Sequence, residues 1–401
     1  MNVRPRIVAV FQRAALIVSY HVHRVQRSRL RKQREISWVV GPDECASMVL
    51  QIARAIPRSY SVNFTEEFVY KSSYDYRFRT KPGSRWRWLE RMIAGPILLG
   101  RLMNQADGFI YVGATGYLLT GIDEREFEFA YLAKKGVPIV CYWCGSDIRS
   151  TKRMHELEKE TGLPNISTYM GERGPIFESE EWDESKRRIA DVASRHASAM
   201  FSNTVDHLSY LTMGTEPFLY FLPDDPLPNP EKFDDVSAIV IVHATTSPVI
   251  KGTPLVRAAI AQLRAEGYDF EYVELIGVPN ATVKYEIGRA HIVLNQFYGF
   301  SPAVFGVEAL AAGCVVMMSS DEFVETDLPA GSNECWVVTK HHQVYTNLKR
   351  LLDDRTQLEP IARRGRDWAE KYAMRAHAGA LMLRTLDAVL EGTYSAPAVR
   401  R

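Results

Sequence analysis

The chain has 401 residues, enough for two or three domains. Hydrophobic residues make up 46% of it and charged residues 24%, which excludes a disordered chain, a collagen-like repeat and a multi-span membrane protein. The formal net charge is only +1, but residues 1–35 carry a local charge of +8, so the rest carries −7. This distribution predicts an anionic partner for the N-terminal segment and argues against a protein that wraps nucleic acid.

Residues 1–35 are predicted to form a basic amphipathic arm that lies outside the domains. Its apolar stretch, Ile7 to Tyr20, is too short for a spanning helix, which needs about twenty residues. No signal-peptide cleavage pattern follows it. The arginines that come next favour a helix lying in the surface of an anionic membrane. A flexible tail and a short signal anchor are the alternatives.

From Ile36 onward, strand and helix patterns alternate, which is typical of a parallel sheet covered on both faces. The expected strands are residues 36–40, 60–64, 108–112, 138–142, 199–202 and 218–222. The expected helices lie near residues 44–55, 85–103, 124–135, 184–196 and 205–213.

The segment Asp-Asp-Pro-Leu-Pro-Asn-Pro-Glu-Lys at residues 224–232 cannot sustain a helix or a central strand, so it predicts a linker. A second α/β unit follows. Its expected strands are 238–242, 272–276, 292–294 and 314–318, and its expected helices lie near 255–266, 283–289, 304–312 and from 343 onward.

The predicted fold class is therefore α/β, with two doubly wound, Rossmann-like domains that face a central ligand cleft. The expected boundaries are 36–225 for the first domain, 226–236 for the linker and 237–373 for the second domain. A C-terminal helix near 374–392 is expected to pack back on the first domain.

Common signatures of other enzyme classes are absent from the sequence. It contains no G-x-G turn for a dinucleotide and no G-x-x-x-x-G-K-[ST] phosphate loop. It also lacks H-E-x-x-H and G-x-S-x-G. Cys141 and Cys144 form C-Y-W-C, but no second pair accompanies them, so buried thiols are favoured over zinc or redox chemistry.

The second domain carries the most informative residues. Lys251 follows a buried strand and opens a helix beside Gly252, where a lysine can neutralise a phosphate. Glu308 lies within an apolar helical pattern, and a buried carboxylate there needs a partner such as a sugar or ribose hydroxyl. A surface lysine and an ion-paired glutamate are the alternatives.

These motifs occur in the order seen in retaining GT-B glycosyltransferases. The segments are H-A-x-x-x-x-x-x-K-G-T from His243 to Thr253, Gly277-Val-Pro, Ala290-His-Ile-Val-Leu-Asn-Gln and V-E-A-L-A-A-G-C-V-V. In the first half, Gly113-Ala-Thr-Gly-Tyr-Leu-Leu, residues 132–140 and Gly145-Ser-Asp-Ile-Arg149 are similar too. The chain thus resembles the group-1, family-four-type nucleotide-sugar transferases over about residues 105–320.

The resemblance implies roles for particular residues. Lys251 would hold the donor diphosphate, Glu308 would bind the ribose, and backbone amides at Ser301–Val304 would face the phosphates. The implied donor-binding set is Lys251, Gly252, Thr253, Gly277, Ser301, Ala303, Val304 and Glu308. Acceptor-side or phosphate candidates are Gly145, Ser146, Asp147, Arg149 and His243, with Asp147 or His243 orienting the acceptor hydroxyl. The implied catalytic residues are Lys251, Glu308 and Asp147, and neither a metal nor another cofactor is implied.

Two positions depart from the pattern. Phe300 stands where such enzymes carry an earlier glutamate, and residues 245–247 lack the usual arginine before the lysine. Arg149 or Arg289 is expected to replace the missing positive charge.

The expected function is transfer of a sugar from a nucleotide-sugar donor to a glycan or lipid-linked acceptor in cell-surface polysaccharide or glycolipid assembly. The enzyme would be cytoplasmic, bound peripherally to the inner face of the membrane through residues 1–35. A basic and aromatic strip, Tyr70–Arg91, would form a membrane-side acceptor groove, with a nucleic-acid surface or a solvated loop as alternatives. A nucleotide-sugar epimerase on the same fold and a non-catalytic binding subunit are the competing functions.

Overall fold

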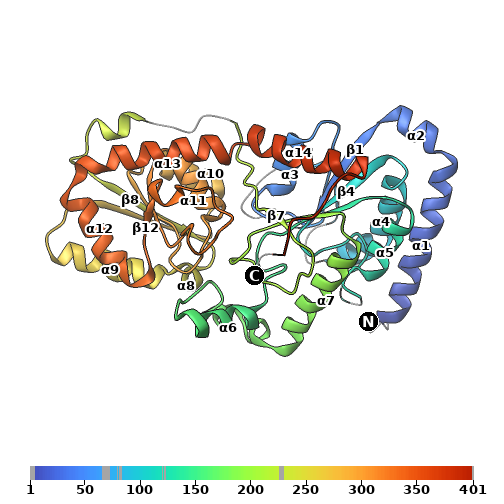
Figure 1. The fold of residues 1–401 in the computed structure, drawn as a ribbon, viewed down its shortest axis with the longest axis horizontal. Helices are drawn as coiled ribbons and strands as arrows, with labels where there is room; N and C mark the ends of the chain where they lie inside the picture. The colour runs from blue at the N-terminus through green and yellow to red at the C-terminus, as the bar shows by residue number, and fades with distance from the viewer. Residues whose placement is uncertain are drawn as a thin grey trace.

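The computed structural model describes residues 5–65, 73–78, 80, 84–119, 121, 123–224 and 230–399. Two parallel sheets organise these residues (Figure 1). The first sheet has seven strands in the order β3-β2-β1-β4-β5-β6-β7, and the second has five in the order β12-β11-β10-β8-β9. The predicted α/β class with two Rossmann-like sheets is therefore confirmed.

Apolar runs form the strands of the first sheet, and amphipathic helices cover both of its faces. The strands are β1 Ile36–Pro42, β2 Tyr60–Asn63, β3 Tyr76–Arg77, β4 Ala106–Val112, β5 Ile139–Tyr142, β6 Ala199–Ser202 and β7 Glu216–Pro217. The helices are α3 Met48–Ala55, α4 Arg85–Leu102, α5 Glu126–Lys134, α6 Thr151–Thr161 and α7 Glu180–His196. Strands buried on both faces are typical of parallel sheets, which explains their nearly continuous apolar sequences.

The second sheet repeats this arrangement with shorter connections. Its strands are β8 Val240–Thr245, β9 Glu271–Ile276, β10 Ile292–Leu294, β11 Val315–Met318 and β12 Val337–Val338. Its helices are α8 Pro248–Lys251, α9 Thr253–Ala265, α10 Asn280–Arg289, α11 Ala303–Ala311, α12 Val344–Asp353 and α13 Leu358–Tyr372. Short 3-10 turns lie at Met170–Arg173, Pro175–Glu178, Pro230–Phe233, Ser332–Glu334, His341–Gln343 and Arg355–Gln357.

The last helix, α14 Arg375–Glu391, leaves the second sheet and lies along the first (Figure 1). Its buried face contributes Ala378, Met382 and Leu386 to the apolar layer that contains strand residue Val40. Contact is close, because a Cβ on Gly379 would lie 2.8 Å from the Cβ of Ala55 in α3. The C-terminal segment thus joins the two sheets through packing as well as through the chain.

Residues 5–35 are integrated into the first domain rather than forming a separate arm. They form α1 Pro5–Val25 and α2 Arg27–Gln33. Leu16 and Tyr20 are buried in the core of the first sheet, against α4. The side chain of Asn104 donates to the backbone oxygen of Tyr20 at 3.0 Å. The expectation of an arm outside the domains, and its flexible-tail alternative, are therefore wrong for the described part of this segment.

Three local predictions differ from the structure. Residues 205–213 are a loop rather than a helix, because the amides of Thr204, Val205 and Asp206 donate to the carboxylate of Glu325. The strand expected at 218–222 is instead the short β7, and Leu222 pairs only with Met374 in an isolated bridge. Helix α6 was not predicted because its sequence is mostly polar.

Part of the Tyr70–Arg91 strip, namely residues 70–72, 79 and 81–83, lies outside the described residues, as do linker residues 225–229. In the part that is described, Arg87 lies 4.7 Å from the centre of the Phe78 ring and donates to the backbone oxygen of Thr80 at 2.9 Å. This arginine therefore stacks inward rather than lining an open basic groove. No helix among the described residues is long and apolar enough to span a membrane.

Candidate functional site

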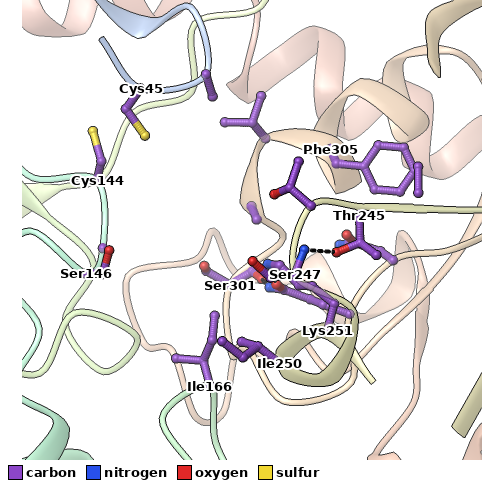
Figure 2. A pocket seen from close by; sticks show the side chains of 18 of the residues that line it. Cys45, Cys144, Ser146, Ile166, Thr245, Ser247, Ile250, Lys251, Ser301 and Phe305 are labelled. Carbon is purple, nitrogen blue, oxygen red and sulfur yellow. Dashed lines mark hydrogen bonds between the residues drawn. The ribbon is translucent and has the colours of Figure 1, made fainter. Parts of the chain in front are cut away.

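A cleft of about 520 Å³ lies between the carboxyl ends of the two sheets (Figure 2). Loops that follow β1, β5 and β6 line one side of it, and loops that follow β8, β9 and β10 line the other. Parallel α/β sheets bind their ligands at this edge because the chain crosses there from strand to helix.

Lys251, at the end of α8, lines the cleft and donates from its Nζ to the side-chain oxygen of Gln296 (Figure 2). The amide of Gln296 in turn donates to the backbone oxygen of Ser301 at 2.6 Å. Burial lowers the pKa of Lys251 to about 8; the charge of Asp206 opposes this shift and that of Arg149 adds to it. The ammonium is therefore desolvated, unlike that of a surface lysine.

Ser301, Ala303 and Val304 also line the cleft, at the start of α11. Ala303 adopts a positive φ of 53°, which is uncommon for a residue with a Cβ. The nearby amides do not face open solvent. Phe300 N donates to Asp206 Oδ1 at 2.9 Å and Ser301 N donates to Asp206 Oδ2 at 3.0 Å.

Glu308 projects from α11 into the same cleft and is 5% exposed. Its carboxylate accepts long hydrogen bonds, 3.3 and 3.4 Å, from the side chain of Asn280. Burial raises its pKa, and the charge of Lys284 partly counters this rise. Glu308 is therefore neither a surface residue nor part of a close ion pair within the described part of the chain. Gly277, with a positive φ of 63°, forms the neighbouring wall after β9.

Three predicted residues of the second domain, His243, Gly252 and Thr253, are not among those that line the cleft. His243 is fully buried; its Nδ1 lies 2.7 Å from the backbone oxygen of Leu294 and its Nε2 lies 2.8 Å from the hydroxyl of Thr253. Burial lowers the pKa of His243, so the ring is neutral at pH 7. Gly252, with φ of 83°, ends α8 and allows α9 to begin. These residues position Lys251 rather than face a ligand.

The Gly145–Arg149 turn supplies the opposite side of the cleft. Gly145, Ser146 and Arg149 line it. The Asp147 carboxylate instead accepts from the amides of its own turn, Cys144 N at 2.9 Å and Gly145 N at 2.7 Å. Burial raises the pKa of Asp147, while these amide bonds lower it. The geometry gives Asp147 a structural role that places Ser146 and Arg149.

Of the two arginines expected to supply positive charge, only Arg149 reaches the cleft. It is 7% exposed and donates from its Nε to the backbone oxygen of Asp206. Arg289 lies outside, paired with Glu271 and with Glu286 at 2.7 Å.

Cys141 and Cys144 do not act as a pair. Cys141 lies in the core, where burial raises its pKa to about 12. Cys144 lines the cleft beside Cys45 of the β1–α3 loop, on the same side of the cleft (Figure 2). A hydrogen bond with the Cys45 thiol, together with burial, raises the pKa of Cys144 well above its usual range. Among the described residues, no cluster of three or more His, Cys, Asp and Glu could hold a metal ion.

Several cleft residues were missed from the sequence, above all Asp206 with its neighbours Asn203 and His207. Asp206 lies in the loop that follows β6, at the edge of the sheet where ligands bind, and this position was the available signal. It was overlooked because the residues around it were predicted to be a helix. Gln296, after β10, was quoted in the resemblance but not recognised as the partner of Lys251.

Two Rossmann-like domains with a cleft between their carboxyl edges define the GT-B fold. Sucrose-phosphate synthase from Thermosynechococcus elongatus has a similar structure, with a TM-score of 0.54 and 11% identity over 90% of this chain and 100% of that one. WaaG, a glycosyltransferase involved in lipopolysaccharide biosynthesis, gives a TM-score of 0.49 and 10% identity over 88% and 99%. A putative UDP-N-acetylglucosamine 2-epimerase from Listeria monocytogenes gives 0.48 and 11% over 92% and 100%. Neither a protein-family model nor a curated protein sequence matches the chain. The likeness to sucrose-phosphate synthase, together with the two sheets and the cleft between them, shows that the chain has the GT-B fold.

Proposed function

We propose that this protein is a retaining hexosyltransferase that moves a sugar from a nucleotide-sugar donor to a glycan or lipid-linked acceptor. The observation that carries the proposal is the convergence of Lys251, Glu308 and the start of α11 on one cleft. These groups come from two separate strand–helix units of the second sheet, and Arg149 reaches the cleft from the first. Cell-surface polysaccharide or glycolipid assembly is the process that such a donor and acceptor would serve.

The second-domain side of the cleft could bind both the diphosphate and the ribose of a nucleotide. Lys251 would bind the diphosphate and stabilise the negative charge that grows on it as the sugar leaves. A single well-placed donor of this kind contributes about 3–4 kcal/mol to the transition state. Glu308 has only long bonds to Asn280, so its carboxylate can accept hydrogen bonds from ribose hydroxyls.

Arg149 replaces the cation that residues 245–247 lack. It lies on the first domain, and burial lowers its pKa without neutralising it, since an arginine stays charged. A diphosphate in the cleft would thus meet Lys251 from one domain and Arg149 from the other. The protein's own cations can offset its charge, and the mechanism requires no metal.

Helix α1 supports the proposed membrane partner because it is apolar on two sides. One side is buried against α4, and the other is exposed. The exposed apolar residues are Ile7, Val10, Phe11, Ile17, Val18, Val22 and Val25, which we call the outer stripe. At 100° per residue they fall on one face, and they extend over roughly 27 Å of helix. Exposed apolar area of this kind marks an interaction site.

The charges around the outer stripe favour an anionic bilayer over a protein partner. Arg6 and Arg24 are exposed on α1, and α2 adds exposed Arg27, Arg29 and Lys32. Each basic residue near an anionic leaflet contributes about 1 kcal/mol, and the outer stripe would enter the headgroup boundary. The inner face of the membrane, where a lipid-linked acceptor would be presented, is the proposed location.

The test is a thermal-shift screen against UDP, GDP, ADP and their common sugar conjugates, followed by a transfer assay. A ligand that binds the folded state alone raises its stability by RT ln(1 + [L]/Kd). We expect one nucleotide class to stabilise the protein, and its sugar conjugate to be consumed only when a glycan or lipid-linked acceptor is present. Failure of every conjugate to bind would refute the proposal. Conversion of the donor without an acceptor would instead indicate an epimerase.

A further inference from the structure

Two buried carboxylates join the two domains, each accepting hydrogen bonds from backbone amides of the other domain. Asp206, from the first domain, accepts from the amides of Phe300 and Ser301 and from the Ser301 hydroxyl, the last at 2.5 Å. Glu325, from the second domain, accepts from the amides of the 204–206 loop, including Asp206 N at 2.7 Å. Asp206 is 2% exposed and Glu325 is fully buried. The described parts of the two domains are therefore held together at this point by a reciprocal pair of contacts.

The Asp206 contact differs from the Glu325 contact in its surroundings. The Asp206 carboxylate lies at the start of α11, where backbone amides and a hydroxyl converge on both of its oxygens. Its charge also acts on Lys251 and Arg149, the two cations of the cleft. Two amides, one hydroxyl and two cations are the donors that a phosphate group takes in proteins. Asp206 thus occupies two amides and a hydroxyl that an anionic ligand could bind, and its charge acts on the two cations that such a ligand would meet.

We propose that Asp206 is a built-in competitor of the donor phosphate, so that a nucleotide sugar must displace its carboxylate from Phe300 and Ser301 in order to bind. This inference rests on the proposed function, because it takes the ligand to be a nucleoside diphosphate sugar. A phosphate and a carboxylate cannot share the same two amides, since like charges at hydrogen-bond distance repel strongly.

A diphosphate can displace the Asp206 carboxylate because it interacts more strongly with these donors. It carries more charge and more acceptor oxygens, and it can reach Lys251 directly. Since Asp206 belongs to the first domain and the amides to the second, displacement also releases one contact between the domains. Donor binding would therefore be coupled to the position of one domain relative to the other.

The experiment compares Asp206→Asn with Glu325→Gln in the full chain at pH 7.5. At this pH Lys251, whose pKa is lowered to about 8 by burial, keeps most of its charge. Glu325, whose pKa is raised to about 7 by burial and by the charge of Asp206, is mostly ionised. Each variant then removes one negative charge and weakens one interdomain contact, but only Asp206→Asn frees the amides at the start of α11. Calorimetry measures the affinity for inorganic pyrophosphate, and separately for UDP, GDP, ADP and their sugar conjugates. Thermal unfolding without ligand checks folding, and Asp206→Ser replaces Asp206→Asn if that variant does not fold.

We expect Asp206→Asn to bind pyrophosphate about tenfold more tightly, because charge-assisted hydrogen bonds to the competing carboxylate are lost. Glu325→Gln should stay within about twofold of the wild type, since the Asp206 carboxylate is still present in that variant to occupy the amides of Phe300 and Ser301. Equal gains in both variants would overturn the inference and indicate a general effect of charge or domain separation. Unchanged or weaker binding by Asp206→Asn, or no pyrophosphate binding by either protein, would also overturn it. If Asp206→Asn shows the expected gain with pyrophosphate but no nucleotide or sugar conjugate binds, only the proposed function is refuted.

Discussion

Replacing Lys251 with methionine should stabilise the folded protein while damaging the site. The ammonium is desolvated, and the lowering of its pKa from 10.5 to about 8 corresponds to roughly 3 kcal/mol of unfavourable free energy. Methionine retains an unbranched apolar stem and removes the charge. It also loses the hydrogen bond to Gln296, which contributes about 1 kcal/mol. The free energy of unfolding of Lys251→Met at pH 7 should therefore exceed that of the wild type by about 2 kcal/mol.

The pH dependence of the free energy of unfolding follows from the lowered pKa of Lys251. Below pH 8, Lys251 is charged in both the folded and the unfolded chain, so the folded state carries the whole desolvation penalty. Between pH 8 and 10.5 the unfolded chain holds the proton while the folded chain releases it. The wild type gains stability through this window, because stability rises with pH where the unfolded state binds more protons. The advantage of Lys251→Met should consequently shrink between pH 7 and about pH 9.5.

The same substitution should weaken ligand binding, although it stabilises the folded protein. Loss of the cation should weaken nucleotide-sugar binding or turnover by about 100-fold. Urea denaturation at both pH values and calorimetry with the donor measure the two effects. Lys349→Met is the matched control, since Lys349 is an outward-facing lysine of the same domain that pairs with Glu266 at 3.3 Å. A variant that is less stable at pH 7, or that binds the donor as tightly as the wild type, would refute the reasoning.

Three further outcomes are expected. Glu308→Gln should weaken affinity for both the nucleotide and its sugar conjugate, measured by calorimetry, because a neutral amide accepts weaker hydrogen bonds from hydroxyls; a loss of stability alone would contradict this. Val18→Asp in the outer stripe should reduce sedimentation with anionic vesicles, while Phe323→Asp, a still more exposed apolar site on the second domain, should not. Wild-type stability relative to Glu325→Gln should fall as pH rises from about 4.5 to 7, because the raised pKa of Glu325 makes the folded chain bind the proton more tightly. A pH-independent difference in urea denaturation would contradict this last prediction.

The regular elements could be predicted because burial on both faces of a parallel sheet leaves a clear pattern. The sequences of β6 and β10 match the expected strands to the residue, and most helices agree within a few residues at each end. The loop at 205–213 could not be predicted, because its amides are satisfied by Glu325, more than 100 positions away. A local pattern carries no information about such a distant partner.

The candidate site was predicted only in part for the same reason. Lys251 and Glu308 line the cleft because each lies on a strand–loop–helix unit whose carboxyl edge is fixed by the fold. His243 and Asp147 occupy the same edge, but their side chains bond to the protein itself. Sequence position thus indicates the edge of the sheet but not whether a polar side chain faces the ligand or the protein interior. Asp206 is the reverse case, a residue without a motif whose contacts are all tertiary.

Helix α1 would relate the membrane to the cleft, because one of its apolar sides is packed in the first domain and the other is exposed. Leu16 and Tyr20 fix the inner side of this helix to the core of the first domain, so a bilayer that binds the outer stripe would orient that whole domain. The second domain would then be the part that moves when the two domains change their relative position. Asp206 and Glu325 lie where such a movement would make or break contacts. In this arrangement the acceptor side would stay at the lipid surface, while donor exchange on the second domain would depend on whether the phosphate or the Asp206 carboxylate occupies the amides of Phe300 and Ser301.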